Sequence, residues 1–155
     1  MNYIGIVGAR KYRNKRCIQN FVKGLAEDSV IVTGACEGVC SWSIEQAEKI
    51  GIDVLVYKPD LQNTNSYYEV AERYYQRNRE LIERCDFVYA FFSERKGFRG
   101  GTKFEVEYAV KIGKPVKIYT ENKKSEIIYQ PDLFSFDRES YSNPAWQRFF
   151  VENVC

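Results

Sequence analysis

The sequence predicts an α/β protein, namely a Rossmann-like three-layer fold with a five-stranded, mostly parallel sheet and a C-terminal appendage. Five short apolar runs alternate with four segments of helical spacing, and such alternation is typical of a parallel sheet with helices on both faces. The length of 155 residues fits about one domain. A hydrophobic content of 45% is enough for a core and too high for a disordered chain.

The predicted elements follow one another in order. Each strand is an apolar run that stops at Gly, Pro or a polar turn, and each helix carries apolar residues three and four positions apart. Strands are expected at 3–7, 30–32, 53–57, 87–92 and 115–119. Helices are expected around 17–25, 41–50, 68–84 and 104–112, and Gly51 and Gly113 are expected to end the second and fourth of them.

Two segments of different character divide the chain. We predict a domain over residues 1–120 and a tail over residues 121–155, which is too short to form a domain of its own. The tail is rich in aromatic residues, and we expect it to pack them on the domain or on a second subunit. These residues are Phe134, Phe136, Tyr141, Trp146, Phe149 and Phe150.

The chain contains no histidine. This excludes Ser-His-Asp triads, Cys-His dyads, HExxH zinc sites and histidine bases within one chain. Cys36 and Cys40 are too few ligands for a metal site, and we interpret them as small buried residues at a turn. No metal and no cofactor is therefore expected.

The charge and the cysteine content bear on the binding partners and the cellular location of the protein. Lys and Arg number 23 and Asp and Glu number 21, so the net charge of +2 disfavours a nucleic-acid-coating role. The five cysteines, the absence of a signal-peptide pattern and the lack of an apolar run near ~20 residues indicate a cytoplasmic protein with reduced thiols and no membrane association.

Small and basic residues follow three of the predicted strands. Ligands of open α/β sheets bind at the carboxyl ends of the strands, where small residues and helix N-termini let backbone N–H groups contact an anion. We therefore predict a site for a nucleotide-like small molecule there. The first turn lacks the GxGxxG pattern of dinucleotide-binding dehydrogenases. The predicted ligand-binding residues in these loops are Gly8, Ala9, Arg10, Thr33, Gly34, Ala35, Gly38, Gly100, Gly101 and Thr102.

These loops resemble a known group of proteins. Gly8-Ala9-Arg10, Thr33 to Gly38, Arg77-Asn78 and Gly100 to Glu105 occur in the order and spacing of the SLOG superfamily, the Rossmann-like group named for the SMF/DprA and LOG proteins. The similarity covers residues 2–119 and is greatest to small YspA-like members. It implies a phosphate and ribose cradle formed by Gly8, Arg10, Gly34, Gly38, Gly101 and Thr102. It also places Arg77 at the arginine position of the family, and we add Arg77 and Asn78 to the predicted ligand-binding residues. It also implies a homodimer or higher homo-oligomer.

The segment GTKFEVEYAVKIGKPV is similar to the nucleoside 2-deoxyribosyltransferases, and LOG-type phosphoribohydrolases carry a comparable pattern. In both groups the Glu three residues after Thr is catalytic, and here that residue is Glu105. A carboxylate at this place could attack a ribose C1′ or stabilise an oxocarbenium ion. The alternative is that Glu105 has no catalytic role and is an acidic residue in the first turn of the helix, where the helix dipole stabilises its charge.

Three functions stay open on the sequence. The first is a binding or sensing module for a nucleotide or nucleotide-derived ligand. The second is an N-glycosidic-bond hydrolase or deoxyribosyltransferase that uses Glu105, and the third is a DprA-like nucleic-acid-binding protein. Two assignments also keep two interpretations. Arg77 either binds a ligand or pairs with Glu80 or Glu83. A cluster of tyrosines either stacks a base or packs in the core or against a subunit, namely Tyr67, Tyr68, Tyr74 and Tyr75.

Overall fold

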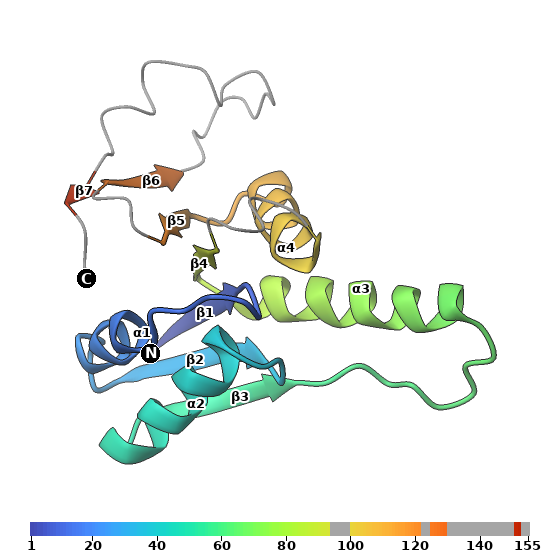
Figure 1. The fold of residues 1–155 in the computed structure, drawn as a ribbon, viewed down its shortest axis with the longest axis horizontal. Helices are drawn as coiled ribbons and strands as arrows, with labels where there is room; N and C mark the ends of the chain where they lie inside the picture. The colour runs from blue at the N-terminus through green and yellow to red at the C-terminus, as the bar shows by residue number, and fades with distance from the viewer. Residues whose placement is uncertain (94–99, 122–124, 130–150, 153–155) are drawn as a thin grey trace.

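The computed structural model describes residues 1–93, 100–121, 125–129 and 151–152 (Figure 1). The strands are β1 (Asn2–Gly8), β2 (Ser29–Gly34), β3 (Asp53–Tyr57), β4 (Phe87–Phe92), β5 (Val116–Thr120), β6 (Ser125–Tyr129) and β7 (Val151–Glu152). The helices are α1 (Lys15–Lys23), α2 (Val39–Ile50), α3 (Tyr67–Arg84) and α4 (Gly100–Lys111). The tail aromatics Phe134, Phe136, Tyr141, Trp146, Phe149 and Phe150 lie outside the described residues.

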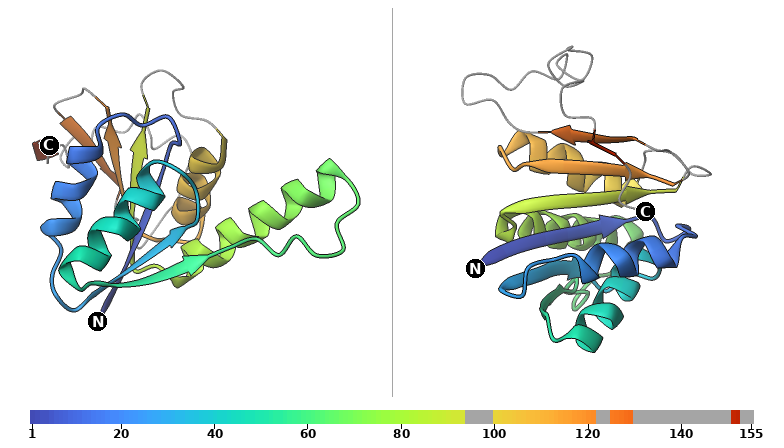
Figure 2. Two further views of the ribbon diagram at one scale, coloured as in Figure 1. Left: turned by 60° about the horizontal axis from the view of Figure 1, so that its bottom comes forward. Right: turned by 90° about the vertical axis from the view of Figure 1, so that its left-hand side faces the viewer.

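Five parallel strands form the centre of the sheet in the order β3-β2-β1-β4-β5. Helices α1 and α2 cover one face and helices α3 and α4 the other (Figure 2). The predicted Rossmann-like fold is thus confirmed. Strand β6 adds to β5 in the antiparallel direction, and β7 adds to β6. Neither was expected from the sequence.

The core consists of two layers, one on each side of the sheet. Neighbouring strand residues point to opposite faces, so Ile6 packs beneath α1 and α2 while Val7 packs beneath α3 and α4. In the same way Ile31 and Val32 divide between the two layers. This explains why the central strands are apolar without alternation, as a sheet buried on both faces requires.

Turns end the helices where the sequence places them. Gly51 caps α2 in the left-handed conformation, with φ of 80°, and Gly113 has φ of 81° in the turn after α4. Glycine adopts this backbone conformation without the steric cost that a Cβ would bring. The two predicted helix ends are confirmed.

The cysteines in the described part of the chain differ in oxidation state. Cys36, Cys40 and Cys85 are free, whereas Cys17 is disulfide-bonded. The expectation that all thiols are reduced is therefore wrong for Cys17. Among the helices in the described part of the chain, none has the length and apolar character needed to cross a membrane.

The end of β1 lies directly against the start of α2. A Cβ built on Gly8 would lie 2.7 Å from Cγ2 of Val39 and 2.8 Å from its Cβ and Cγ1. Because Val39 is fully buried and β-branched, it has little freedom to move away. The close approach of β1 to α2 therefore depends on glycine at position 8.

We predict that Gly8→Ala lowers the free energy of unfolding by about 1–3 kcal/mol, because the added methyl overpacks this contact. Equilibrium denaturation by urea measures the change. Gly24→Ala is the control, since its Cβ would meet nothing closer than 3.5 Å. An equal effect of the two substitutions would contradict the packing argument.

Candidate functional site

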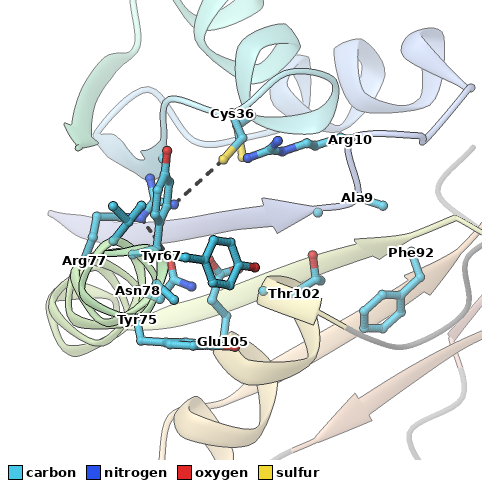
Figure 3. Close-up of a pocket in the computed structure, with 17 residues that line it drawn as sticks. Ala9, Arg10, Cys36, Tyr67, Tyr75, Arg77, Asn78, Phe92, Thr102 and Glu105 are labelled. Carbon is cyan, nitrogen blue, oxygen red and sulfur yellow. Dashed lines mark hydrogen bonds between the residues drawn. The ribbon is translucent and has the colours of Figure 1, made fainter. Parts of the chain in front are cut away.

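A cavity of about 600 Å³ opens at the carboxyl ends of β1, β2 and β4, next to α3 and the N-terminal half of α4 (Figure 3). It includes the place where the strand order reverses between β1 and β4, the position at which open α/β sheets bind ligands. The lining residues are Gly8, Ala9, Arg10, Gly34, Cys36, Cys40, Tyr67, Val70, Ala71, Tyr74, Tyr75, Arg77, Asn78, Phe92, Gly101, Thr102 and Glu105.

Most of the predicted site residues come together in this cavity. Nine of them line it: Gly8, Ala9, Arg10, Gly34, Arg77, Asn78, Gly101, Thr102 and Glu105. Four others, Thr33, Ala35, Gly38 and Gly100, are not among the lining residues. The fully buried Thr33 hydroxyl donates a hydrogen bond of 2.6 Å to the carbonyl of Ile6, so Thr33 joins β2 to β1.

Gly38 fixes the loop after β2 against the loop after β1. Its φ is 76°, and a Cβ placed on it would lie 2.9 Å from the carbonyl oxygen of Arg10. The first loop is held from its other side by Glu121, at the end of β5, which accepts a hydrogen bond from the backbone N–H of Arg13. The glycine of the second loop therefore sets the shape of the cavity rather than forming its wall.

Arg77, on α3, is the cation in the cavity wall that is most deeply buried, with 6% of its surface exposed. Its Nε donates to Oδ1 of Asn78 at 2.8 Å, and its Nη1 donates to the carbonyl oxygen of Tyr57 at 3.2 Å. Gly34 lets the guanidinium approach β2, since a Cβ there would lie 2.8 Å from Nη1.

The third contact of Arg77 is with a cysteine. Nη2 of Arg77 lies 3.8 Å from Sγ of Cys36, and the two side chains point toward each other from opposite walls (Figure 3). The alternative in which Arg77 pairs with Glu80 or Glu83 is not what the structure has. Glu80 accepts a hydrogen bond from Gln76, and Glu83 accepts one from Tyr108.

Cys36 and Cys40 are part of the cavity rather than only small residues at a turn. A hydrogen bond from the Cys40 thiol lowers the pKa of Cys36 to about 5 against the effect of burial, and Arg77 and Arg10 contribute in the same direction. The same hydrogen bond, together with burial, raises the pKa of Cys40. At neutral pH Cys36 is therefore a thiolate with a thiol neighbour.

Glu105 lies on α4 with 8% of its surface exposed. Because α4 begins at Gly100, Glu105 falls in its second turn, beyond the region where the helix dipole stabilises an acidic residue. Burial raises the pKa of the Glu105 carboxyl to about 8; Arg77 acts against this rise, and the charge of Cys36 adds to it. The carboxyl is therefore mostly protonated at neutral pH in the free protein.

One wall of the cavity is aromatic and comes from the N-terminal half of α3. Tyr67, Tyr74 and Tyr75 lie here with Val70 and Ala71. The ring of Tyr75 packs on Phe104 of α4 at a centroid distance of 4.6 Å, whereas Tyr67 is 89% exposed. The tyrosines noted in the sequence thus divide between packing and the cavity rim. Tyr68 is not among the lining residues.

The cavity contains side chains of three kinds. Arg10 and Arg77 carry positive charge, Cys36 and Glu105 can carry negative charge, and the α3 tyrosines offer flat apolar faces. Elsewhere in the described part of the chain, as here, no three His, Cys, Asp or Glu side chains gather as a metal site would require. The geometry defines a Rossmann-like domain with a mixed polar and aromatic cavity at its strand ends.

Comparison with known proteins agrees with this class. The X-ray structure of DNA processing protein A (DprA) from Streptococcus pneumoniae is similar, with a TM-score of 0.61 and 17% sequence identity over 75% of this chain. The chain spans about half of that protein, 49%, and at this identity the match concerns the fold alone. It supports the Rossmann-like fold. No curated protein matches the sequence.

The sequence profile described as nucleoside 2-deoxyribosyltransferase matches residues 39–143. Since the match covers more than half of the chain, the protein belongs to this family. The matched segment includes Arg77 and Asn78, the α3 aromatics and Glu105, that is, most of the cavity apart from the loop after β1 and the start of the loop after β2.

We predict that Glu105→Gln stabilises the fold at high pH. The folded-state pKa of about 8 lies above the ordinary value of 4.5, so this carboxyl costs stability as the pH rises from about 4.5 through 8. The amide removes that cost. At pH 8 the free energy of unfolding should rise by roughly 2 kcal/mol, a gain of the kind seen when a strained site is relieved.

Urea denaturation of the variant and the parent at pH 5 and pH 8 measures the effect, which should nearly vanish at pH 5. Glu107→Gln is the matched control, because Glu107 lies on the same helix, outside the cavity, and pairs with Lys103 at 3.8 Å. A gain for Glu105→Gln of equal size at the two pH values would contradict the raised pKa of the Glu105 carboxyl.

Proposed function

We propose that the cavity binds a nucleoside or nucleotide and that Glu105 acts on its N-glycosidic bond, either by hydrolysis or by transfer of the deoxyribosyl group. One observation carries the proposal: the buried carboxyl of Glu105 lies in a cavity that also contains guanidinium groups and tyrosine rings. Membership of the nucleoside 2-deoxyribosyltransferase family supports it.

The parts of a nucleoside correspond to the parts of the cavity. A base would stack on the tyrosines of α3, since aromatic rings offer a flat apolar face. The sugar would lie over the small residues Gly34, Gly101 and Thr102, which let its hydroxyls approach the backbone. Arg10, exposed at the cavity edge, would meet a 5′-phosphate where one is present.

The chemistry needs one ionised carboxylate and no histidine. An oxygen of Glu105 forms a bond to C1′ while the C1′–N bond breaks, and the base leaves with the electron pair and takes a proton from water. Water, or a second base, then attacks C1′ and releases Glu105. Among the cavity-lining residues in the described part of the chain, Glu105 is the only carboxylate, so we assign it the role of nucleophile.

A second candidate is a module that binds the same ligand without turnover. The observation that favours it is the protonation of Glu105 in the free protein, because a neutral carboxyl donates a hydrogen bond to a ligand and does not attack it. The two candidates share the ligand and differ in the role of this one group.

We predict that the protein releases free base from 2′-deoxyribonucleosides or their 5′-monophosphates, or exchanges the base when a second one is supplied. Glu105→Gln should lose this activity by a factor on the order of 10³ or more. Chromatographic separation of base and nucleoside follows the reaction. Glu107→Gln should keep the parental rate.

The outcomes separate the candidates. Base release that persists in Glu105→Gln would remove Glu105 as the nucleophile. Binding without base release, measured by calorimetry with the same ligands, would leave the binding module. If the ligands neither bind nor react, both candidates fail.

The pH dependence gives a further prediction. Because attack requires the ionised form, kcat/KM should rise with pH and level off above about 8, the pKa of Glu105 in the free protein. Initial rates at low substrate concentration between pH 6 and pH 9.5 measure the profile. A rate that falls as the pH rises through 8 would instead assign Glu105 the role of a proton donor.

A further inference from the structure

Two thiols face the cavity, and neither takes part in the proposed reaction. Cys36, in the loop after β2, is half-buried, and Cys40, in the first turn of α2, is buried; both line the cavity. The Ser41 N–H donates a hydrogen bond of 3.1 Å to the Cys36 carbonyl, which closes the turn that contains the two cysteines. The two cysteines are thus four residues apart across one turn, and each side chain shifts the pKa of the other.

The surroundings of this pair favour negative charge on one sulfur. Nη2 of Arg77 lies 3.8 Å from Sγ of Cys36, and Arg10 acts on the same sulfur. A thiolate that is accessible and close to cations is the form of cysteine that reacts with peroxides. Cys85 is the contrast: it is fully buried, donates to the carbonyl of Leu81 at 3.1 Å, and burial raises its pKa to about 12.

We propose that Cys36 and Cys40 form a peroxide-reactive modification site in the cavity wall, in which Cys36 is oxidised first and Cys40 then closes a disulfide. The proposal does not depend on the nature of the ligand or on turnover. The co-reactant is a small hydroperoxide that enters through the cavity.

The steps balance. The Cys36 thiolate attacks the peroxide, an S–O bond forms, the O–O bond breaks, and the alcohol or water product leaves after taking a proton. Cys40 then loses its proton and attacks the Cys36 sulfur, so that an S–S bond forms and the S–O bond breaks with release of water. The two sulfurs together give up two electrons, which the peroxide takes.

Oxidation would change the charge of the cavity. The thiolate beside Arg77 disappears, so Nη2 is left to attract an anionic group of a ligand. The carboxyl of Glu105 also loses a negative neighbour that raises its pKa, and it ionises at lower pH. The pair therefore links the redox state of the chain to the two charged groups on which the cavity depends.

The test treats the full chain, with Cys36, Cys40 and Cys85 reduced, with equimolar hydrogen peroxide. Peptide mass spectrometry should find a disulfide between Cys36 and Cys40 and a reduced Cys85 in the same molecules. Cys40→Ser should stop at a sulfenic acid on Cys36, trapped by dimedone, and Cys36→Ser should leave Cys40 unoxidised. Oxidation of Cys36 no faster than that of Cys85 would overturn the proposal.

Cys40 is buried, so its variant needs a second measurement. Alkylation of the wild-type chain by iodoacetamide at pH 6 should label Cys36 at least ~100-fold faster than Cys85. Equal rates would again overturn the proposal. If the disulfide forms, the stability gain of Glu105→Gln should level off at a higher pH, and be larger at pH 8, in the reduced chain than in the oxidised chain, because the Cys36 charge raises the folded-state pKa of Glu105 only in the reduced form. An unchanged pH dependence would refute the link to Glu105 while leaving the modification site in place.

Discussion

The cavity depends on the burial of one guanidinium. Arg77, on α3, is almost entirely removed from water, and a buried charge is tolerated only where hydrogen bonds and opposite charge replace the lost solvent. Its partners come from three parts of the chain: the end of β3 through Tyr57, the loop after β2 through Cys36, and α3 itself through Asn78. The guanidinium thereby holds α3 against the strand ends.

The same charge governs the titrating groups around it. It favours the thiolate of Cys36 and opposes the effect of burial on Glu105. Cys36 and Glu105 compete for this positive charge, since each negative group raises the cost of ionising the other. A change of charge at Cys36 therefore shifts the pKa of Glu105 without any movement of the backbone.

The features of the fold that depend on local sequence pattern and on sheet topology could be predicted from the sequence. The strands 53–57 and 87–92 have the predicted bounds, because each is a compact apolar run with a turn signal at both ends. Parallel order brings strand ends to one edge, which is why Gly8, Gly34 and Gly101 could be assigned to one site in advance. Glu105 was assigned through the family resemblance of its segment. Helix α2 begins two residues before its predicted start, since Gly38 precedes it without a side-chain cap.

What could not be predicted are contacts between distant segments. No pattern near Cys36 in the sequence predicts its contact with Arg77, which lies 41 positions further on. Without that contact, two cysteines at a turn are interpreted as unreactive. The aromatic wall has the same origin, because the packing of α3 against the sheet and α4 decides which tyrosines line the cavity. Edge strand β6 is likewise defined by its pairing with β5 rather than by a pattern of its own.

The absence of histidine takes on a specific meaning in this cavity. Histidine commonly supplies the group that titrates near neutral pH, and here burial and charge produce such groups from a carboxyl and a thiol. Glu105 is moved upward from its ordinary pKa and Cys36 downward, so that their titrations fall on either side of neutrality. Both shifts depend on the packing of α2, α3 and α4 around the strand ends. Each of the two groups thus titrates on the opposite side of neutrality from its ordinary pKa.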